Sequence, residues 1–264
     1  MLEVTGLTRA FGSHVAIADV SLQVADGEFV AIVGPSGCGK STLLRCLAGL
    51  LPPTSGRVVL DGVPVTRVPD RLAVVFQDYG RSLYPWLTVA DNVALPLRRP
   101  ATRMTVAGRP GRSGQARRRT ALAALDAVGL AGFGGRHPWQ LSGGMQQRVA
   151  IARALACDPV LLLMDEPFGS MDAQMREDLE DLVLRVRAER NITILLVTHD
   201  IDESVYTGDR VVVLSRGPGR VVADVPVDLP SPRDQIATKE LREFARLRAE
   251  VSRLVRASKM PEPC

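Results

Sequence analysis

The chain has 264 residues, 46% of them hydrophobic, which is enough to bury a sizeable core in one large domain or two lobes that share a core. No apolar run approaches the roughly 20 residues of a membrane-spanning helix, and the N-terminus lacks the pattern of a secretion signal, so we expect a cytoplasmic protein. The formal charge of +4 does not indicate a nucleic-acid-binding surface, because eight arginines lie between Arg98 and Arg119, leaving 25 basic residues against 29 acidic ones elsewhere.

The four cysteines, Cys38, Cys46, Cys157 and Cys264, are scattered along the chain without a C-x-x-C pair or a nearby histidine cluster. This spacing argues against a disulfide framework and against a zinc site. We therefore expect reduced thiols.

Residues 2–33 are predicted to form strands of two kinds. Val20, Leu22 and Val24 alternate with polar residues, as in an antiparallel sheet with one wet face, whereas Phe29 to Val33 is a short, mostly apolar run typical of a strand covered on both faces. The apolar positions between Lys40 and Leu50 then fall on one helical face, and Gly49 predicts the end of that helix.

The turn between this strand and this helix fits the pattern G-x-x-x-x-G-K-[ST] in the position where a phosphate-binding loop requires it. Its glycines let backbone N–H groups approach phosphate oxygens, and the helix N-terminus adds a favourable dipole. The predicted nucleotide-binding residues of this cradle are Gly34, Pro35, Ser36, Gly37, Cys38, Gly39, Lys40, Ser41 and Thr42.

Within the cradle, Lys40 is expected to neutralise the β- and γ-phosphates of ATP, and Ser41 is expected to hold Mg²⁺ through its hydroxyl. Lys40 is one of only three lysines beside thirty arginines, so the position keeps a compact ammonium where the composition favours arginine. Cys38 is either a small filler or a thiol made reactive by the helix start.

Between Pro96 and Gln140 no apolar strand is recognisable, and the stretch Ala121 to Val128 is predicted to be helical. We expect a helical sublobe that carries a loose basic loop. The arginine-rich stretch 98–119 could contact nucleic acid or anionic lipid headgroups, but a solvated insertion is the favoured interpretation.

Two further apolar runs, Val160 to Met164 and Ile192 to Val197, each follow a helical pattern, as expected of a parallel sheet. Asp165 and Glu166 come directly after the first run, where α/β folds bind ligands. Asp165 is expected to hold Mg²⁺, and Glu166 to orient and polarise the attacking water. His199 follows the second run, so its imidazole could reach the γ-phosphate. A single amphipathic helix is predicted over Asp234 to Ser258.

The segment LSGGMQQRVAIARAL, Leu141 to Leu155, resembles the signature of ABC transporter ATPases. The other marks of this family follow in order as Phe11, taken as the aromatic before the first strand pair, Gln77 in VFQD, SMD at Ser170 to Asp172, and His199. The resemblance covers essentially the whole chain. It implies an α/β fold with a P-loop NTPase core of mainly parallel sheet, an N-terminal antiparallel β subdomain and an inserted α-helical subdomain.

The same resemblance implies a head-to-tail dimer, either a homodimer or a pairing with a similar ATPase. In it, Ser142, Gly143 and Gly144 of one copy close on the γ-phosphate held by Lys40 of the other. Phe11 would stack on adenine, or else be a core aromatic, and Gln77 would sense Mg²⁺ and the γ-phosphate. Asp172 would be a nucleotide-site residue, and it stays in register although SMD departs from the commoner SALD.

The aromatics Tyr79, Tyr84 and Trp86 next to Gln77 either dock a membrane partner or fill the hinge of the sublobe. Within the family, VFQDYGRSLYPWLTV, HPWQLSGGMQQR and SRGPGRV resemble the nitrate, sulfonate and taurine import group. The implied protein is an ATP-hydrolysing importer subunit on the cytoplasmic face of the inner membrane. Its partners would be transmembrane permease subunits and, through them, a periplasmic or lipoprotein solute-binding protein.

We expect a catalytic α/β lobe at 1–80 and 157–230, a helical sublobe at 81–156 and a C-terminal helix segment at 231–264. The alternative is a soluble ABC-type ATPase that acts on nucleic acid. Its known representatives carry a long coiled-coil insertion or two cassettes in one chain, and this chain has neither, so no direct nucleic-acid contact is expected.

Overall fold

The computed structural model describes residues 1–78, 82–98, 113–169 and 171–258. Its strands are β1 (Leu2–Phe11), β2 (His14–Val24), β3 (Phe29–Val33), β4 (Ser55–Leu60), β5 (Val63–Pro64), β6 (Leu72–Val75), β7 (Leu161–Asp165), β8 (Thr193–Val197), β9 (Arg210–Leu214) and β10 (Val221–Pro226). Its helices are α1 (Lys40–Leu47), α3 (Val89–Ala94), η1 (Leu95–Arg98), α4 (Gly114–Ala127), η2 (Pro138–Gln140), α5 (Gly143–Leu155), α6 (Ala173–Arg190), α7 (Ile201–Thr207) and α8 (Arg242–Ala257).

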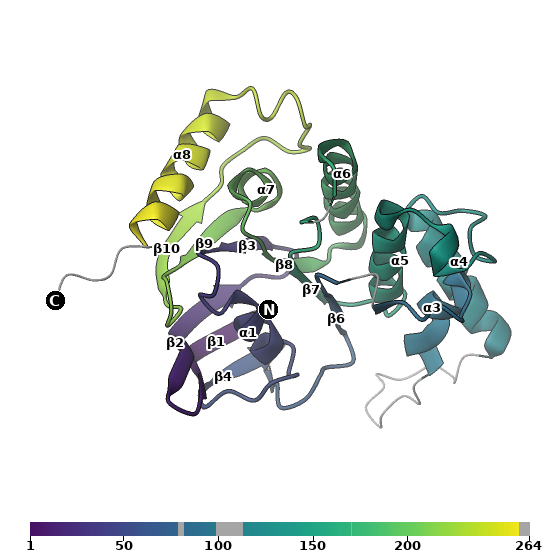
Figure 1. Cartoon of the computed structure of the whole chain (residues 1–264), viewed down its shortest axis with the longest axis horizontal. Helices are drawn as coiled ribbons and strands as arrows, with labels where there is room; N and C mark the ends of the chain where they lie inside the picture. Colours follow the sequence, from purple (N-terminus) through teal and green to yellow (C-terminus); the bar gives the residue numbers. More distant parts are fainter. Residues whose placement is uncertain (79–81, 99–112, 170, 259–264) are drawn as a thin grey trace.

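The strands form two sheets, and both predicted kinds of strand are confirmed. One sheet is antiparallel, with the order β2-β1-β4-β5. The other has the order β10-β9-β3-β8-β7-β6, and its neighbours from β9 to β6 run parallel, while β10 pairs antiparallel with β9. Helix α1 lies between the two sheets, and α6, α7 and α8 lie on the other side of the larger sheet (Figure 1).

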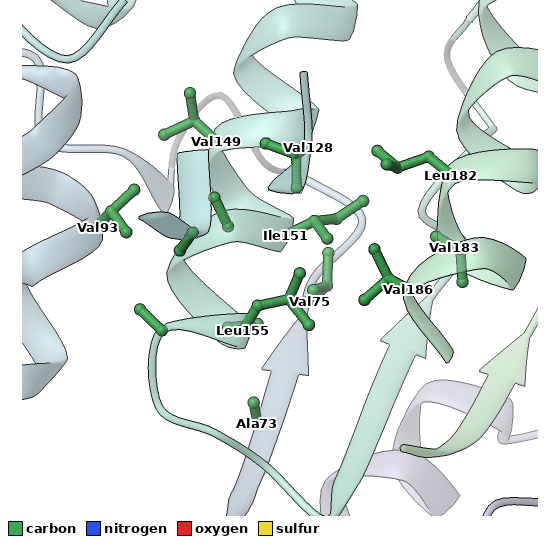
Figure 2. Close-up of a cluster of buried hydrophobic side chains, with 14 of the residues drawn as sticks. Ala73, Val75, Val93, Val128, Val149, Ile151, Leu155, Leu182, Val183 and Val186 are labelled. Atoms are coloured by element: carbon green, nitrogen blue, oxygen red, sulfur yellow. The ribbon is translucent and has the colours of Figure 1, made fainter. Parts of the chain in front are cut away.

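Three clusters of buried side chains hold these layers together. One joins the antiparallel sheet and α1 to the inner face of the larger sheet, and another joins α7 and α8 to β9 and β10. The third joins the α3, α4 and α5 helices to β6, β7 and α6. Figure 2 shows its centre, where Ile151 and Leu155 of α5 lie beside Val75 of β6, and Val186 of α6 lies on the other side of Val75 from Leu155. The helical lobe is thus fixed to the sheet edge next to β6, and α5 carries that contact.

The C-terminal helix begins later than predicted. Helix α8 starts at Arg242, and the residues from Asp234 onward form turns instead. The Asp234 carboxylate accepts the backbone N–H groups of Ile236 and Ala237, which closes a tight local turn that competes with helix. Ile236 is consequently 72% exposed instead of joining the apolar face formed by Phe244, Leu247 and Val251.

Buried glutamates of α6 and α7 lie close to the turn segment before α8. Glu180 is 2% exposed and accepts a hydrogen bond from Gln235 Nε2 at 3.0 Å, while Glu203 is 4% exposed and accepts one from Thr198 Oγ1. Burial raises the pKa of Glu180 to about 7, and it raises the pKa of Glu203 as well.

This raised pKa predicts a stability that depends on pH. Because folded Glu180 holds a proton that the unfolded chain, with a pKa of 4.5, releases, the free energy of unfolding should fall as pH rises from 4.5 through about 7. The variant E180Q keeps a hydrogen-bond acceptor but cannot ionise, so at pH 8 it should be more stable than the wild type by up to about 3 kcal/mol.

Urea unfolding at pH 5 and pH 8 measures how the free energy of unfolding changes with pH. The exposed control E189Q on the same helix should keep the wild-type slope, and an unchanged slope in E180Q would contradict the account.

Within the described part of the chain, no helix combines the length and the apolar character needed to cross a membrane.

Candidate functional site

The predicted site residues gather at one edge of the parallel sheet. The neighbouring strands β3, β8, β7 and β6 all end there; β3 is followed directly by glycine, β8 and β7 by polar residues, and β6 by Phe76 and then Gln77. The carboxyl ends of parallel strands lie on the same side of a sheet, which is where open α/β folds bind ligands. The cradle follows β3, Gln77 follows β6, Asp165 ends β7 and His199 follows β8.

The cradle needs its glycines for two different reasons. Gly37 and Gly39 have φ values of 78° and 93°, in the left-handed region that disfavours side chains. A Cβ atom on Gly39 would also lie 2.6 Å from the backbone oxygen of Ala16, so β2 presses directly on the loop. Helix α1 begins at Lys40, and its N-cap Gly39 supplies no side-chain hydrogen bond to the first turn. Anion binding at such a helix start is therefore favoured.

The ammonium of Lys40 is held inside the cradle. Its Nζ donates to the backbone oxygens of Gly34 at 2.8 Å and of Pro35 at 3.2 Å, and the residue is only 6% exposed. A buried positive charge at the centre of a loop of backbone N–H groups suits a polyphosphate.

Cys38 is buried in the floor of the cradle. A Cβ atom on Gly34 would lie 2.9 Å from its Sγ, so the thiol fills the space beneath the first glycine. Burial raises its pKa, and the nearby Lys40 only partly offsets this. These features favour the small-filler interpretation over the reactive thiol. The buried Cys38 and Cys46 are free thiols.

Ser41 and Asp165 face each other across the cradle. The Ser41 hydroxyl donates to Asp165 Oδ1 at 3.0 Å, and Asp165 is 6% exposed. Burial raises the pKa of Asp165, and Glu166 next to it raises it further, while the Ser41 hydrogen bond opposes both. A hydroxyl and a carboxylate oxygen are ligands that Mg²⁺ accepts, so this pair fits the predicted ion. Among the described residues, no three His, Cys, Asp or Glu side chains form a preformed metal cluster.

Glu166 lies at the centre of a hydrogen-bonded group of three side chains. Its Oε2 accepts from Gln77 Nε2 at 3.1 Å and lies 3.1 Å from His199 Nδ1. Glu166 has a φ of 44°, which is uncommon for a residue other than glycine. Its backbone N–H donates a hydrogen bond to the backbone oxygen of Val197 at 2.8 Å. Strained backbone of this kind often marks functional positions. Three residues predicted separately from the sequence are thus in direct contact.

The signature turn lies in the helical lobe. Ser142 caps α5, with its Oγ accepting the backbone N–H of Met145 at 3.3 Å, and Ser142 and Gly143 are exposed. A Cβ atom on Gly144 would lie 2.7 Å from the Met175 sulfur, so α6 packs on the signature turn of its own chain. In Figure 1, α5 and α1 belong to different parts of the molecule.

Asp172 is the N-cap of α6, where its Oδ1 accepts the backbone N–H of Met175 at 2.9 Å. Ser170, the first residue of SMD, lies outside the described residues.

The position predicted for Phe11 needs correction. Phe11 is the last residue of β1 and pairs with His14 at the hairpin tip, so it lies within the first strand pair and not before it. Its side chain is 47% exposed, which excludes the alternative of a core aromatic.

Tyr84 and Trp86 lie on the helical lobe, in contact with each other at a centroid distance of 5.3 Å. They are 41% and 70% exposed, so they do not fill the interior of the hinge. Tyr79 and residues 99–112 of the arginine-rich stretch lie outside the described residues.

Sequence reasoning missed Thr198 and Met175. The Thr198 hydroxyl donates to Glu203 and accepts the backbone N–H of Asp200, which fixes the turn that carries His199. A polar residue directly after an apolar run was the signal available for it. No local pattern indicated the contact of Met175 with Gly144.

Comparison with known proteins identifies close relatives. Residues 17–169 match the profile of the family described as ABC transporter. The chain is 48% identical over 222 residues to the taurine import ATP-binding protein TauB of Yersinia pestis bv. Antiqua, covering 84% of this chain and 82% of the relative. It is 45% identical over 241 residues to the nitrate import ATP-binding protein NrtD of Synechococcus elongatus, covering 90% and 84%.

Among solved structures, the dimeric structure of a bacterial ABC transporter cassette superposes with a TM-score of 0.73 at 35% identity. The match covers 86% of this chain and 99% of that one. A dimeric post-hydrolysis state of an ATP-binding cassette, bound to ADP and phosphate, gives the same values.

Proposed function

Because the chain belongs to the ABC transporter family of ATP-binding proteins, we propose that it hydrolyses ATP to drive import of a small solute through a separate membrane permease. It is an ABC-type ATPase of the nitrate, sulfonate and taurine importer group, and its relatives are import subunits, so the alternative of action on nucleic acid is set aside. Within this group, we propose a substrate such as nitrate, a sulfonate or taurine.

The observation that carries the catalytic assignment is the placement of Glu166 between Gln77 and His199, beside the Ser41 and Asp165 pair. Glu166 is the general base that orients and polarises the attacking water. Gln77 and His199 hold its carboxylate in place and respond to the γ-phosphate. A carboxylate in a fixed position holds the attacking water in line with the phosphorus atom. The water has then lost its translational freedom before the reaction starts, which lowers the barrier to hydrolysis.

The triphosphate of ATP binds in the cradle formed by residues 34–42. The N–H groups of the loop and the first turn of α1 contact its oxygens, and Lys40 neutralises charge on the β- and γ-phosphates. Ser41, Asp165 and Gln77 are the proposed ligands of Mg²⁺, which when bound neutralises charge that develops on the phosphate oxygens. Phe11 stacks on the adenine.

The active form is a head-to-tail dimer, as a homodimer or with a similar ATPase. Ser142, Gly143 and Gly144 contact the γ-phosphate bound to the partner chain, and Asp172 belongs to the same interface. The exposure of Ser142 and Gly143 at the start of α5 supports this arrangement, since another helix N-terminus is offered to the anion.

We further propose that the subunit works at the cytoplasmic face of the inner membrane, bound to permease subunits and through them to a periplasmic or lipoprotein solute-binding protein. The chain would divide into a catalytic lobe at 1–80 and 157–230, a helical sublobe at 81–156 and a C-terminal segment at 231–264.

The exposed Tyr84 and Trp86 pair is the proposed contact with the permease. Removing a large aromatic from the centre of an interface costs about 2 kcal/mol or more. W86A should therefore bind the permease about 30-fold more weakly, while ATP hydrolysis by the isolated subunit stays unchanged. Copurification with the permease and uptake of radiolabelled solute into proteoliposomes measure the loss.

The matched control is I236A, which removes an apolar side chain of similar exposure from the turn segment before α8. It should copurify and transport like the wild type. If wild-type chain and permease hydrolysed ATP without any solute uptake, the importer function itself would be wrong.

A further inference from the structure

The exposed ring of Phe11 has a positive charge beneath it. The guanidinium carbon of Arg9 lies 4.6 Å from the centroid of the Phe11 ring, within the range of a cation–π contact. Both residues belong to β1, two positions apart, so their side chains leave the strand on the same face.

Arg9 is anchored on the protein side of that ring. Its Nη1 donates to the backbone oxygen of Pro52 at 3.0 Å, and its Nε is buried without a hydrogen-bond partner among the described residues. A buried guanidinium N–H without a partner is costly unless its charge is compensated, and the face of the Phe11 ring provides compensation. The ring is still 47% exposed, so its outer face remains open to a flat ligand.

The hairpin that carries this pair is connected to the cradle. The segment after α1 is hydrogen-bonded to β1 on both sides of Arg9, through Thr54 N to Thr8 O at 2.8 Å and Ala10 N to Thr54 Oγ1 at 3.0 Å. On β2, the second strand of the hairpin, the backbone oxygen of Ala16 packs directly against Gly39 of the cradle. The Phe11 ring is therefore held at a fixed place relative to the phosphate-binding loop.

We infer that Arg9 is a positioning residue for the nucleotide base, which holds the Phe11 ring from below so that adenine stacks on the outer face. This inference rests on the proposed function, because it takes ATP as the ligand. Phenylalanine has no hydroxyl through which a hydrogen bond could fix the ring. The guanidinium takes over that role, and it withdraws electron density from the ring face that adenine meets.

The test compares base-dependent and phosphate-dependent binding in the full-length chain. The variant R9M keeps an unbranched apolar stem but removes the charge. It should raise the KM for MgATP and the Kd for MgADP about three- to tenfold, with kcat unchanged, because the stacked base contributes equally to ground state and transition state. The inhibition constant of tripolyphosphate, which has no base, should stay at the wild-type value. R9K should recover part of the loss.

The matched control is R57M on the adjacent strand β4, where an exposed arginine pairs with Thr5 of β1. It should behave like the wild type. Wild-type KM in R9M would overturn the role of Arg9 while leaving the ATPase function intact. A parallel rise in KM and in the tripolyphosphate constant, or a fall in kcat, would overturn it too, since Arg9 would then act on the shape of the cradle. A wild-type chain that neither binds MgADP nor hydrolyses MgATP would instead refute the proposed function.

Discussion

Replacing Glu166 by glutamine should slow ATP hydrolysis by about 10²- to 10⁴-fold while leaving the affinity for ATP near the wild-type value. The amide oxygen of glutamine can still accept from Gln77 Nε2, so the group of three side chains keeps its shape. What is lost is the negative charge that polarises the attacking water. The cradle, which carries the binding energy, is untouched.

Single-turnover release of phosphate from MgATP measures the chemical step, and a fluorescent ATP analogue measures binding. The control E240Q changes an exposed carboxylate in the turn segment before α8 and should have no effect. Near-normal turnover in E166Q would remove Glu166 from its role as general base, and His199 would become the next candidate for that role.

Lys40→Ala should weaken ATP binding by about 2–4 kcal/mol, equivalent to about 30- to 1,000-fold, and abolish turnover at ordinary ATP concentrations. The phosphates lose their nearest buried cation. The backbone oxygens of Gly34 and Pro35 lose the donor that now folds the loop around it. Both effects weaken the complex with bound ATP itself. The affinity for ATP should therefore fall in K40A, whereas in E166Q only the rate of hydrolysis should fall.

The natural control for this prediction is Lys239, a second lysine, which is hydrogen-bonded to Glu177 far along the chain from the cradle. K239A should bind ATP like the wild type. Isothermal titration with MgATP separates the two variants, and equal affinities for K40A and wild type would exclude Lys40 from the site.

Much of the site was predictable because it follows strand ends. The cradle, Asp165, Glu166 and His199 each lie within two residues of the end of an apolar run, and parallel strands bring such positions to one edge of the sheet. The contact of Glu166 with both Gln77 and His199 was not predictable, since it depends on the order in which β6, β7 and β8 lie in the sheet.

The misplaced start of the C-terminal helix has a different cause. Apolar spacing continued back to Ile236, but the Asp234 carboxylate caps its own neighbours in a turn, and such local side-chain competition does not alter the periodicity. The strands β9 and β10 were also not predicted, although Val211 to Leu214 is as apolar as β3. The pairing of Arg9 with Phe11 needs the three-dimensional hairpin and its anchor at Pro52.

The central claim is that one triphosphate is bound by the cradle of one chain and by the signature turn of another. The most direct measurement is the solution mass of E166Q, by light scattering after size exclusion, with and without MgATP. The account predicts a shift from the 28.5 kDa of the single chain to twice that mass when ATP is present. Adding Ser142→Arg should abolish the shift while the single chain still binds ATP, because the bulky charged side chain blocks closure only in trans. A monomeric E166Q at saturating MgATP, or a double variant that still dimerises, would contradict the claim.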